Sequence, residues 1–498
     1  MRKSFNTTLI FMGILIVLMA WYLAYEKKMK PQAKEAEEKS KQFVTLDKDQ
    51  IQEIVIERMT NAPAEGVTPT ANFFPTYEKT DLKKTGQDWQ IVSPLQDGTD
   101  SATLSGMVSA ITTTKQDRLV EEKPKDLEPF GLKNPLIKIR IKKEASGKVE
   151  EILIGANTPI GFNSYVKTSA SDSVYRAPRS LRTAFDKPLK DLRNKALFSI
   201  ARADITEAEI QTPKESLILK KEDNKDEWTL AREGIPADVN EWNKTLNVVI
   251  DSKATDFPEV DTKASGKALV PFGLSPARTH VTLTRKDKSK FTLLLGQANG
   301  KSYAKREDKE TIFEVDKDVI EKAERPASSY RNLQLSQFNR YDVDRIKLQN
   351  NRGALELVKE GGNWKLPADD KAKIDNTKVD TLLTKLQDIK IDKYLTEKSL
   401  KVTETTQSLM VRLFEKSTSS PSAKNPADKS LEKEKVILKF GKPKTGQVLA
   451  ARNDLPLPFV IKEEDFKTLN LSKQDFIQKE QKPVEQKAEE KKPAEKKS

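Results

Sequence analysis

The tetrapeptide PFGL occurs twice in this chain, at residues 129–132 and 271–274, each time before a stretch with the alternation of a β-strand. A short tryptophan segment recurs with nearly the same spacing, at Trp89, Trp228 and Trp364. An apolar run that ends in glycine is a third recurring landmark, at Gly155, Gly296 and Gly441. Because the three landmarks recur with one period, we interpret the chain as three tandem repeats of one structural unit.

Each copy places an amphipathic helix after the tryptophan segment. One helical face is apolar in every copy, and an aspartate precedes the helix as a candidate N-cap. The apolar positions are Leu104, Met107, Val108 and Ile111 in copy one, Trp242, Leu246, Val249 and Ile250 in copy two, and Val379, Leu382, Leu383, Leu386 and Ile389 in copy three. The candidate caps are Asp100, Asp238 and Asp375, and Glu241 predicts a capping box with Asp238.

The strand after PFGL has the pattern of a half-buried strand in both copies. Its apolar positions are Ile137, Ile139 and Ile141 in copy one, and Thr279, Val281 and Leu283 in copy two. Two more short strands and a helix close each copy. The resulting order of elements predicts an α+β fold with antiparallel sheets. We expect three tandem repeat domains over residues 44–200, 201–339 and 340–478.

The PFGL motif and the recurring glycines have structural interpretations. We expect Phe130 and Phe272 to plug the cores of their domains, and Gly131 and Gly273 to turn the chain into the sheet. The alternative for these residues is a binding role. Gly155, Gly296 and Gly441 are expected to form strand-end turns. A phosphate-binding loop is the alternative for these three glycines, but no G-x-G-x-x-G or G-x-x-x-x-G-K motif supports it.

The N-terminus has the features of an uncleaved membrane anchor. Arg2 and Lys3 precede an uncharged apolar run from Leu9 to Tyr25, which carries Trp21 and Tyr22 near its far end. A cleaved signal peptide and a buried core helix are the alternatives. We expect residues 1–30 to anchor the protein in the inner (cytoplasmic) membrane by a single pass. The body would then lie on the extracytoplasmic, periplasmic side, although the lysines at 27, 28 and 30 weaken the charge argument for this orientation.

Three segments are low in complexity. Residues 31–43 are predicted to form a charged linker, and residues 479–498 to form a disordered tail rich in Lys, Glu and Pro. Residues 416–435 are predicted to be a surface loop inserted into the third copy.

Composition narrows the classes of function. The chain has 498 residues and a formal charge of +13. It contains no cysteine, which excludes disulfides, thiolate metal sites and thiol nucleophiles. Basic and acidic residues alternate along most of the chain, and there is no basic helix or aromatic stacking motif. We therefore expect no nucleic-acid partner. Weak attraction to anionic headgroups or wall polymers remains open.

The residues for catalysis are sparse. His280 is the single histidine of the sequence, so histidine-rich zinc sites are impossible, and it falls on the polar side of a predicted strand. Paired acids occur at Asp369 and Asp370 and at Glu463 and Glu464, but in a chain with 75 acids we interpret them as solvated surface. We predict no catalytic residue, no cofactor-binding residue and no metal ligand, hence a protein that is not an enzyme and needs no cofactor.

In tandem order, the anchor, the tryptophan strand, PFGL, the strand ending in glycine and the segments DLRN and SYRN resemble the bacterial family called domain of unknown function 4340. The resemblance covers roughly residues 44–478 and carries over no site residues. It implies a membrane-anchored protein that accompanies ABC transporter components of the gliding-motility type. The third copy departs from the pattern, because SLKVTETTQSL stands from Ser399 where PFGL is expected.

Two functions follow from these expectations. The first is a non-enzymatic, single-pass extracytoplasmic scaffold or accessory subunit of an envelope complex, with an ABC transporter as the expected partner. The alternative is a binding module for cell-wall polysaccharide or another envelope ligand.

Overall fold

The computed structural model describes residues 13–23, 41–44, 47–64, 73–143, 149–222, 227–258, 266–397, 400–403, 405–416 and 432–478. Residues 13–23 form a helix. Within the described ranges, no helix combines the length and the apolarity needed to cross a membrane. The two ends of the predicted Leu9 to Tyr25 anchor, most of the 31–43 linker and the whole 479–498 tail lie outside the described residues.

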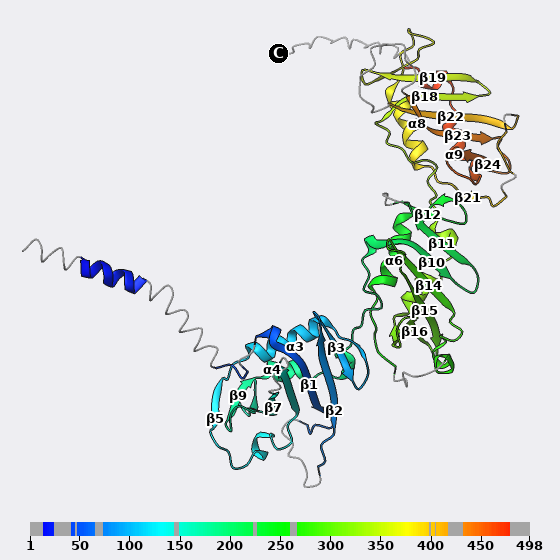
Figure 1. Ribbon diagram of the computed structural model, residues 1–498. Coiled ribbons are helices and arrows are strands. Elements are labelled where there is room, and N and C mark those ends of the chain that lie inside the picture. Colours follow the sequence, from blue (N-terminus) through cyan, green and yellow to red (C-terminus); the bar gives the residue numbers. More distant parts are fainter. Residues whose placement is uncertain are drawn as a thin grey trace, which may run out of the picture.

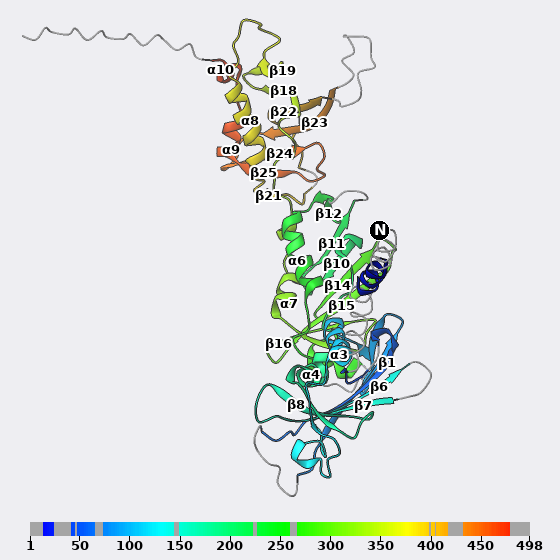
Figure 2. The ribbon, with the colours of Figure 1, turned by 90° about the vertical axis from the view of Figure 1, so that its left-hand side faces the viewer.

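Three antiparallel sheets with their helices follow one another along the molecule, and we call them domains 1, 2 and 3 (Figures 1 and 2). Each sheet lies inside one of the three ranges that the repeat predicts, and the fold is α+β as expected. The three sheets share one arrangement. Strands two to four of domains 1 and 2, and strands two and three of domain 3, run outward from the first strand. The strand that begins at Ile137, Thr279 or Gln407 pairs with the other side of the first strand. A short strand between the long helix and this strand lies at the far edge in domains 1 and 3, where domain 2 has the isolated bridge between Asp256 and Glu314.

Domain 1 has a nine-stranded sheet in the order β4-β3-β2-β1-β6-β7-β8-β9-β5. Its strands are β1 (Ile51–Met59), β2 (Tyr77–Thr85), β3 (Asp88–Ser93), β4 (Asp97–Gly98), β5 (Arg118–Glu121), β6 (Ile137–Lys143), β7 (Val149–Asn157), β8 (Asn163–Thr168) and β9 (Val174–Pro178). Its helices are η2 (Lys48–Gln50), α3 (Ser101–Thr113), η3 (Glu128–Phe130), α4 (Arg179–Phe185) and α5 (Leu189–Leu192).

Domain 2 has an eight-stranded sheet in the order β13-β12-β11-β10-β14-β15-β16-β17. Its strands are β10 (Ile205–Gln211), β11 (Ser216–Lys221), β12 (Trp228–Leu230), β13 (Ile235–Pro236), β14 (Thr279–Arg285), β15 (Lys290–Ala298), β16 (Lys301–Arg306) and β17 (Ile312–Val315). Its helices are η4 (Arg202–Asp204), α6 (Val239–Asp251), η5 (Gly266–Phe272), α7 (Lys317–Ala323) and η6 (Ala327–Tyr330).

Domain 3 has an eight-stranded sheet in the order β20-β19-β18-β22-β23-β24-β25-β21. Its strands are β18 (Val343–Asn350), β19 (Gly353–Glu360), β20 (Asn363–Lys365), β21 (Lys393–Tyr394), β22 (Gln407–Lys416), β23 (Glu432–Gly441), β24 (Gln447–Arg452) and β25 (Phe459–Lys462). Its helices are α8 (Asn376–Asp388), α9 (Glu463–Leu469) and α10 (Lys473–Phe476). Lys416 and residues 432–435, predicted as parts of the inserted loop, belong instead to β22 and β23, and residues 417–431 lie outside the described part.

The long helices α3, α6 and α8 begin at the predicted aspartates. The Asp100 carboxylate accepts a hydrogen bond from the Thr103 N–H at 2.8 Å, and Asp238 and Asp375 cap α6 and α8 in the same way. The capping box predicted for Asp238 and Glu241 is wrong. The Asp238 N–H already donates to the Tyr330 carbonyl at 2.7 Å, and the Glu241 carboxylate instead accepts from Lys244 and Arg325.

The half-buried strands after PFGL are confirmed. Ile137, Ile139 and Ile141 on β6 are fully buried, and so are Thr279, Val281 and Leu283 on β14. The opposite faces of the sheets carry cross-strand ion pairs at partly exposed positions. These pairs include Lys142 with Glu53 at 3.2 Å, Lys220 with Glu207 at 3.3 Å and Lys347 with Glu356 at 3.4 Å. One face of each sheet therefore carries apolar side chains into the core, and the other carries charge to solvent.

The predicted roles of the PFGL phenylalanines and of two glycines are wrong. Phe130 and Phe272 are half-buried and stack edge-on against Tyr165 and Tyr303, whereas Leu132 and Leu274 of the same motifs are buried. Gly155 and Gly296 lie inside β7 and β15 rather than at a turn. Gly441 does end its strand, as expected.

The glycines are explained by the close approach of the PFGL backbone to the strand. A Cβ on Gly155 would stand 2.2 Å from the Phe130 carbonyl oxygen, and one on Gly296 would stand 2.3 Å from the Gly273 oxygen. In domain 3, which lacks PFGL, a Cβ on Gly441 would have 3.5 Å of clearance. Gly131 and Gly273 have φ values of 65° and 66°, in the left-handed region that glycine adopts readily.

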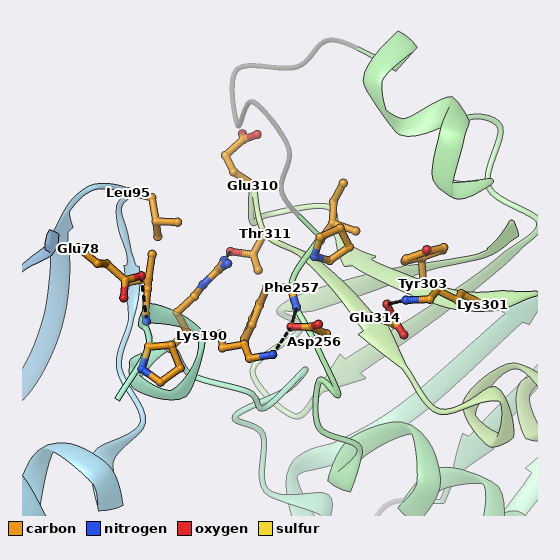
Figure 3. A pocket seen from close by; sticks show the side chains of 15 residues that line it. Glu78, Leu95, Lys190, Asp256, Phe257, Lys301, Tyr303, Glu310, Thr311 and Glu314 are labelled. Carbon is orange, nitrogen blue, oxygen red and sulfur yellow. Dashed lines mark hydrogen bonds and ion pairs between the residues drawn. The ribbon is translucent and has the colours of Figure 1, made fainter. Parts of the chain in front are cut away.

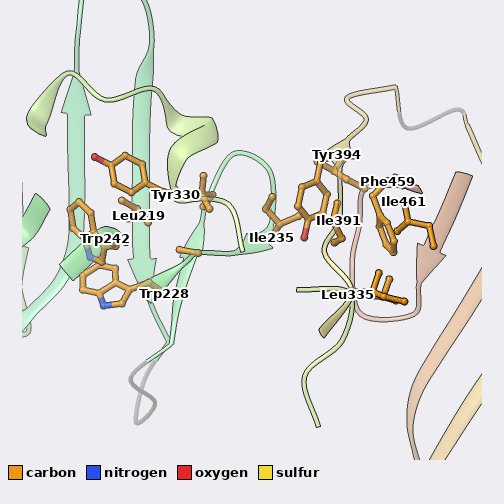
Figure 4. Packing of buried hydrophobic residues seen from close by; sticks show 14 of the residues in the cluster. Leu219, Trp228, Ile235, Trp242, Tyr330, Leu335, Ile391, Tyr394, Phe459 and Ile461 are labelled. Carbon is orange, nitrogen blue, oxygen red and sulfur yellow. The ribbon is translucent and has the colours of Figure 1, made fainter. Parts of the chain in front are cut away.

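The apolar cores are divided unequally. Domain 1 has its own cluster, from Phe43 to Leu192. One continuous cluster runs through domains 2 and 3, and Figure 4 shows it crossing from Trp228 and Ile235 of domain 2 to Leu335, Tyr394 and Phe459. Domains 2 and 3 therefore share buried apolar contacts, whereas domain 1 packs around a separate core.

Candidate functional site at the domain junctions

The chain enters each domain along a short extended strap, which we define as residues 41–44, 195–198 and 333–336. The strap pairs with the segment after the long helix in the same register every time. The isolated β-bridges are Gln42 with Lys115, Ala196 with Lys253, and Gln334 with Lys390. Backbone hydrogen bonds repeat as well, because Gln116, Ala254 and Ile391 donate to the carbonyls of Lys41, Lys195 and Leu333.

An arginine just before the strap joins domain 1 to domain 2. Arg193 is mostly buried, and its guanidinium donates to the Asp97 carboxylate at 2.7 Å and to the Thr311 hydroxyl at 3.3 Å. Its guanidinium also lies 3.9 Å from the centre of the Phe257 ring. Asp97 belongs to domain 1, whereas Thr311 and Phe257 belong to domain 2. A single side chain therefore links the two domains by an ion pair, a hydrogen bond and a cation–π contact.

A cleft of about 800 Å³ lies beside this arginine, between domains 1 and 2 (Figure 3). Two ion pairs line the cleft, Lys190 with Asp256 at 3.4 Å and Lys301 with Glu314 at 2.7 Å. The Phe257 N–H bonded to the Asp256 carboxylate lowers the pKa of that group, and Lys190 lowers it further. Asp256 is therefore held in its charged form. The remaining lining is mixed, with Leu95, Tyr303 and Glu310 among its residues.

The junction between domains 2 and 3 uses positions equivalent to those of the first junction, but the residues and contacts at these positions differ. Arg331 occupies the place of Arg193 and forms a two-pronged ion pair with Glu233, both bonds at 2.8 Å. Tyr394 takes the place of Phe257, and its hydroxyl donates to the Asn332 carbonyl at 2.8 Å. Burial raises the pKa of Tyr394 to about 12. Apolar contacts fill the rest of this junction (Figure 4).

A second arginine position distinguishes the domains that follow another domain. Arg306 and Arg452 are the last residues of β16 and β24, and both are buried. Each pairs with an aspartate two residues on, Asp308 or Asp454, and reaches the preceding strap. Arg306 does so over the Phe198 ring, and Arg452 by donating to the Leu335 carbonyl at 2.8 Å. Domain 1 has Thr168 at this position.

The titratable residues considered for catalysis lie apart from the junctions. His280 sits on β14 opposite Gln211 and Leu294, with its side chain half-buried on the polar face. Glu463 pairs with Lys467 at 2.8 Å, and Glu464 lies 3.7 Å from Lys462. No group of three or more potential metal-binding His, Asp or Glu side chains occurs among the described residues.

Asp369 and Asp370 line a smaller pocket of about 460 Å³ beside Trp364. Lys473 donates to the Asp369 carboxylate at 2.8 Å and lowers its pKa. A general acid needs the opposite shift, because it must hold its proton near neutral pH. The two neighbouring acids thus line one pocket, and the pKa of Asp369 is shifted away from that of a general acid.

Sequence reasoning missed the junction arginines. It noticed the recurring segments DLRN and SYRN without assigning a role to Arg193 and Arg331. One feature of the sequence could have indicated these arginines as ion-pair partners. An acidic residue, Asp97 or Glu233, recurs shortly before the long helix in domains 1 and 2.

Tandem α+β domains joined by arginine-anchored straps define a class of end-to-end repeat protein. The family model described as Domain of unknown function (DUF4340) matches residues 89–267 and 228–408, and the chain belongs to this family. The matches begin at Trp89 and Trp228, and each crosses one junction into the next domain. Comparison with curated proteins and with solved structures finds no match.

Proposed function

We propose that the protein is a non-enzymatic, membrane-anchored extracytoplasmic scaffold, and an accessory subunit of an envelope complex. In this proposal the Leu9 to Tyr25 segment holds the protein in the inner membrane, and the three domains stand on the periplasmic side. The family resemblance suggests ABC transporter components of the gliding-motility type as the first partners to test.

The observation that carries the proposal is the construction of the junctions. Arg193 of domain 1 contacts Thr311 and Phe257 of domain 2. Tyr394 of domain 3 donates to the Asn332 carbonyl of domain 2, and domains 2 and 3 also share a core. A row of domains in fixed relation presents a broad surface at a set distance from its point of attachment. Such a surface suits binding whose energy is spread over many residues.

Complementation of a deletion strain tests this function. The matched pair is a body lacking residues 1–30 and a full-length variant with His280→Ala, Asp369→Asn and Asp370→Asn together. We expect the triple variant to restore function and the anchorless body to fail at equal abundance, because it loses its high local concentration beside the membrane partner. In detergent extracts, the full-length protein should bring down membrane proteins in a fixed ratio.

Full rescue by the anchorless body would contradict the scaffold and favour a diffusible binder. Complete loss of function in the triple variant, with unchanged folding and abundance, would favour an enzyme. Both results are read against protein levels measured by blotting.

The alternative, a polysaccharide-binding module, is favoured by one observation, the cleft beside Arg193 with its mixed polar and aromatic lining. Concave sites with a few polar groups are typical of ligand binding. Sedimentation of the full-length protein with purified wall polysaccharide, in detergent, tests it. Binding that is lost with Tyr303→Ala and kept with the distant Tyr341→Ala would support the alternative over the scaffold.

A further inference from the structure

Domain 3 lacks a strand that the other two domains have at one edge of the sheet. In domain 1, β4 pairs with β3, and in domain 2, β13 pairs with β12, where Thr229 faces Pro236. The sheet of domain 3 ends at β20, which has no further partner strand among the described residues. This edge lies beside β19, at the end of domain 3 away from domain 2 (Figure 2). We call it the open edge and define it by residues 363–366 and 372–374.

The segment equivalent to β4 and β13 folds into turns in domain 3. The Asp369 N–H donates to the Leu366 carbonyl at 2.9 Å, and the Ala372 N–H donates to the Asp369 carbonyl at 3.1 Å. The Asp369 carboxylate also holds this loop, because it accepts from the Lys371 N–H and from Lys473. The segment therefore does not run back along β20 as its counterparts run back along β3 and β12.

Two main-chain groups that pair in domain 2 are unpaired in domain 3. The Ala237 N–H donates to the Trp228 carbonyl at 2.7 Å. The equivalents in domain 3 are Ile374, which takes the place of Ala237 in the isolated bridge beside the long helix, and the recurring tryptophan Trp364. Among the described residues, neither the Ile374 N–H nor the Trp364 carbonyl has a hydrogen-bond partner. A peptide lying between the two segments could satisfy both groups.

The pocket of about 460 Å³ lies between these two segments. Its apolar lining includes the buried residues Trp364, Leu366 and Ile374. Its charged lining residues balance in sign, and they are Lys365, Lys373, Asp369 and Asp370. Its volume falls in the range of sites that bind small molecules or short peptide segments.

A side chain that fills the core of domain 2 is also missing at the open edge. Ile235 of β13 lies opposite Leu230 and is fully buried. By the same count from Trp364 and Ile374, the equivalent residues in domain 3 are Ala372 and Leu366. Domains 1 and 2 therefore show what would complete this edge. It is an extended strand, and the comparison with Ile235 adds an aliphatic side chain to it.

We propose that the open edge of domain 3 binds an extended segment of a partner membrane protein, which adds a strand beside β20 and places an aliphatic side chain against Leu366. The inference rests on the proposed scaffold function and names one surface that it uses. In strand addition, main-chain hydrogen bonds supply affinity and side-chain pockets supply specificity. The chain's own residues 479–498 do not match this chemistry, because they are rich in Lys and Glu and Val484 is their only Val, Leu, Ile or Met.

A reversible disulfide across the open edge tests the proposal. The chain has no cysteine, so Lys365→Cys with Lys373→Cys introduces one pair that can bond. These positions are equivalent to Thr229 and Pro236, and facing residues of an antiparallel pair have a Cα spacing that a disulfide can span. The bond would hold the two segments together and exclude an added strand. The matched control is Thr229→Cys with Pro236→Cys in domain 2, where the segments already pair.

Binding is measured by photocrosslinking of the full-length protein in its native membrane. Benzoylphenylalanine replaces Asp370, which lines the pocket, and replaces the exposed Tyr341 as the control site. We expect the first site to form an adduct with one membrane protein, within a segment that carries an aliphatic residue, and the second to form none with it. Oxidation of the domain 3 cysteines should reduce the adduct on the order of tenfold, because the main-chain hydrogen bonds and the pocket are lost together. Dithiothreitol should restore it, and the domain 2 pair should give the same adduct in both states.

An adduct undiminished by oxidation would overturn the proposal, as would adducts only with lipid, with residues 479–498 or with a second copy of the chain. Thiol titration measures closure of the bond. If the bond does not close, Ala372→Trp, which fills the pocket, should cause the same loss, and an unchanged adduct would again overturn the proposal. Thermal unfolding checks that each variant is folded.

Wild-type pull-downs separate this proposal from the scaffold function. If they yield membrane proteins while the adduct is absent or survives oxidation, the scaffold stands and the assigned edge is wrong. If they yield none, the scaffold itself fails.

Discussion

Gly155 lies so close to Phe130 that a Cβ on the glycine would stand 2.2 Å from the phenylalanine carbonyl oxygen. The neighbouring atoms belong to backbone, so a side chain cannot be accommodated by a rotamer change. The same contact recurs between Gly296 and the backbone of Phe272 and Gly273. It explains why the chain carries a glycine in the strand wherever it carries PFGL.

Alanine at Gly155 or Gly296 should therefore destabilise its own domain by at least about 3 kcal/mol, the upper end of the cost of overpacking. Gly441→Ala is the matched control, because its nearest contact is 3.5 Å away and it should cost under about 1 kcal/mol. Denaturant unfolding of the full-length protein, followed by hydrogen exchange in each domain, measures the difference. Equal costs at all three positions would contradict the close-approach explanation.

The buried leucine of PFGL should matter more than its phenylalanine. Leu132 is 2% exposed, so Leu132→Ala should cost about 2–5 kcal/mol. Phe130 is half-buried and keeps mainly its edge-on contact with Tyr165, so Phe130→Ala should cost about 1–2 kcal/mol. Hydrogen exchange measures the stability of domain 1 in both variants. A lower stability in Phe130→Ala than in Leu132→Ala would contradict this prediction.

The part of the fold that sequence could predict is the part that local rules govern. The alternation at Ile137 to Ile141 and the caps at Asp100 and Asp375 depend on residues close in the chain, and the structure confirms them. The third domain keeps the strand order although PFGL is missing, since its sheet is specified by strand periodicity.

The errors arose where distant segments meet. Nothing local to Gly155 reveals that Phe130 will lie against it, and nothing local to Asp238 reveals that Tyr330 will take its N–H. The junction contacts could not be predicted for the same reason, because Arg193 and Asp97 are 96 residues apart in the sequence. Membrane anchoring and the extracytoplasmic location stay predictions.

The unequal division of the cores predicts two unfolding transitions. Domains 2 and 3 share one apolar cluster and should unfold together, while domain 1 unfolds around its own. Calorimetry of the full-length protein in detergent should show that Phe440→Ala lowers the shared transition on the order of 10 °C and leaves the other in place. Ile152→Ala, in the core of domain 1, should do the converse. Three independent transitions would show that the shared cluster does not couple domains 2 and 3.

Alkaline pH should weaken the junction between domains 2 and 3 through Tyr394. Burial raises the pKa of its hydroxyl to about 12, from an ordinary value of 10.0. The folded state thus holds the proton more tightly than the unfolded state. The resulting stability is fully present below pH 10 and is lost as the pH rises towards 12. Two pKa units correspond to roughly 3 kcal/mol.

The surroundings of Tyr394 allow this loss to be isolated. The charged groups that act on its pKa are Arg452, Asp454, Arg331 and Glu233. Tyr394→Phe removes the titrating hydroxyl and its bond to the Asn332 carbonyl, so the variant should start less stable and fall less steeply above pH 10. Tyr330, whose pKa burial also raises, remains as an internal reference in the same cooperative unit. Calorimetry of the shared transition from pH 8 to pH 11 measures the slope, and tyrosinate absorbance should show one late-titrating group fewer in the variant. Parallel slopes in the two proteins would mean that Tyr394 reaches water in the folded state, and that the second junction is open to solvent like the first.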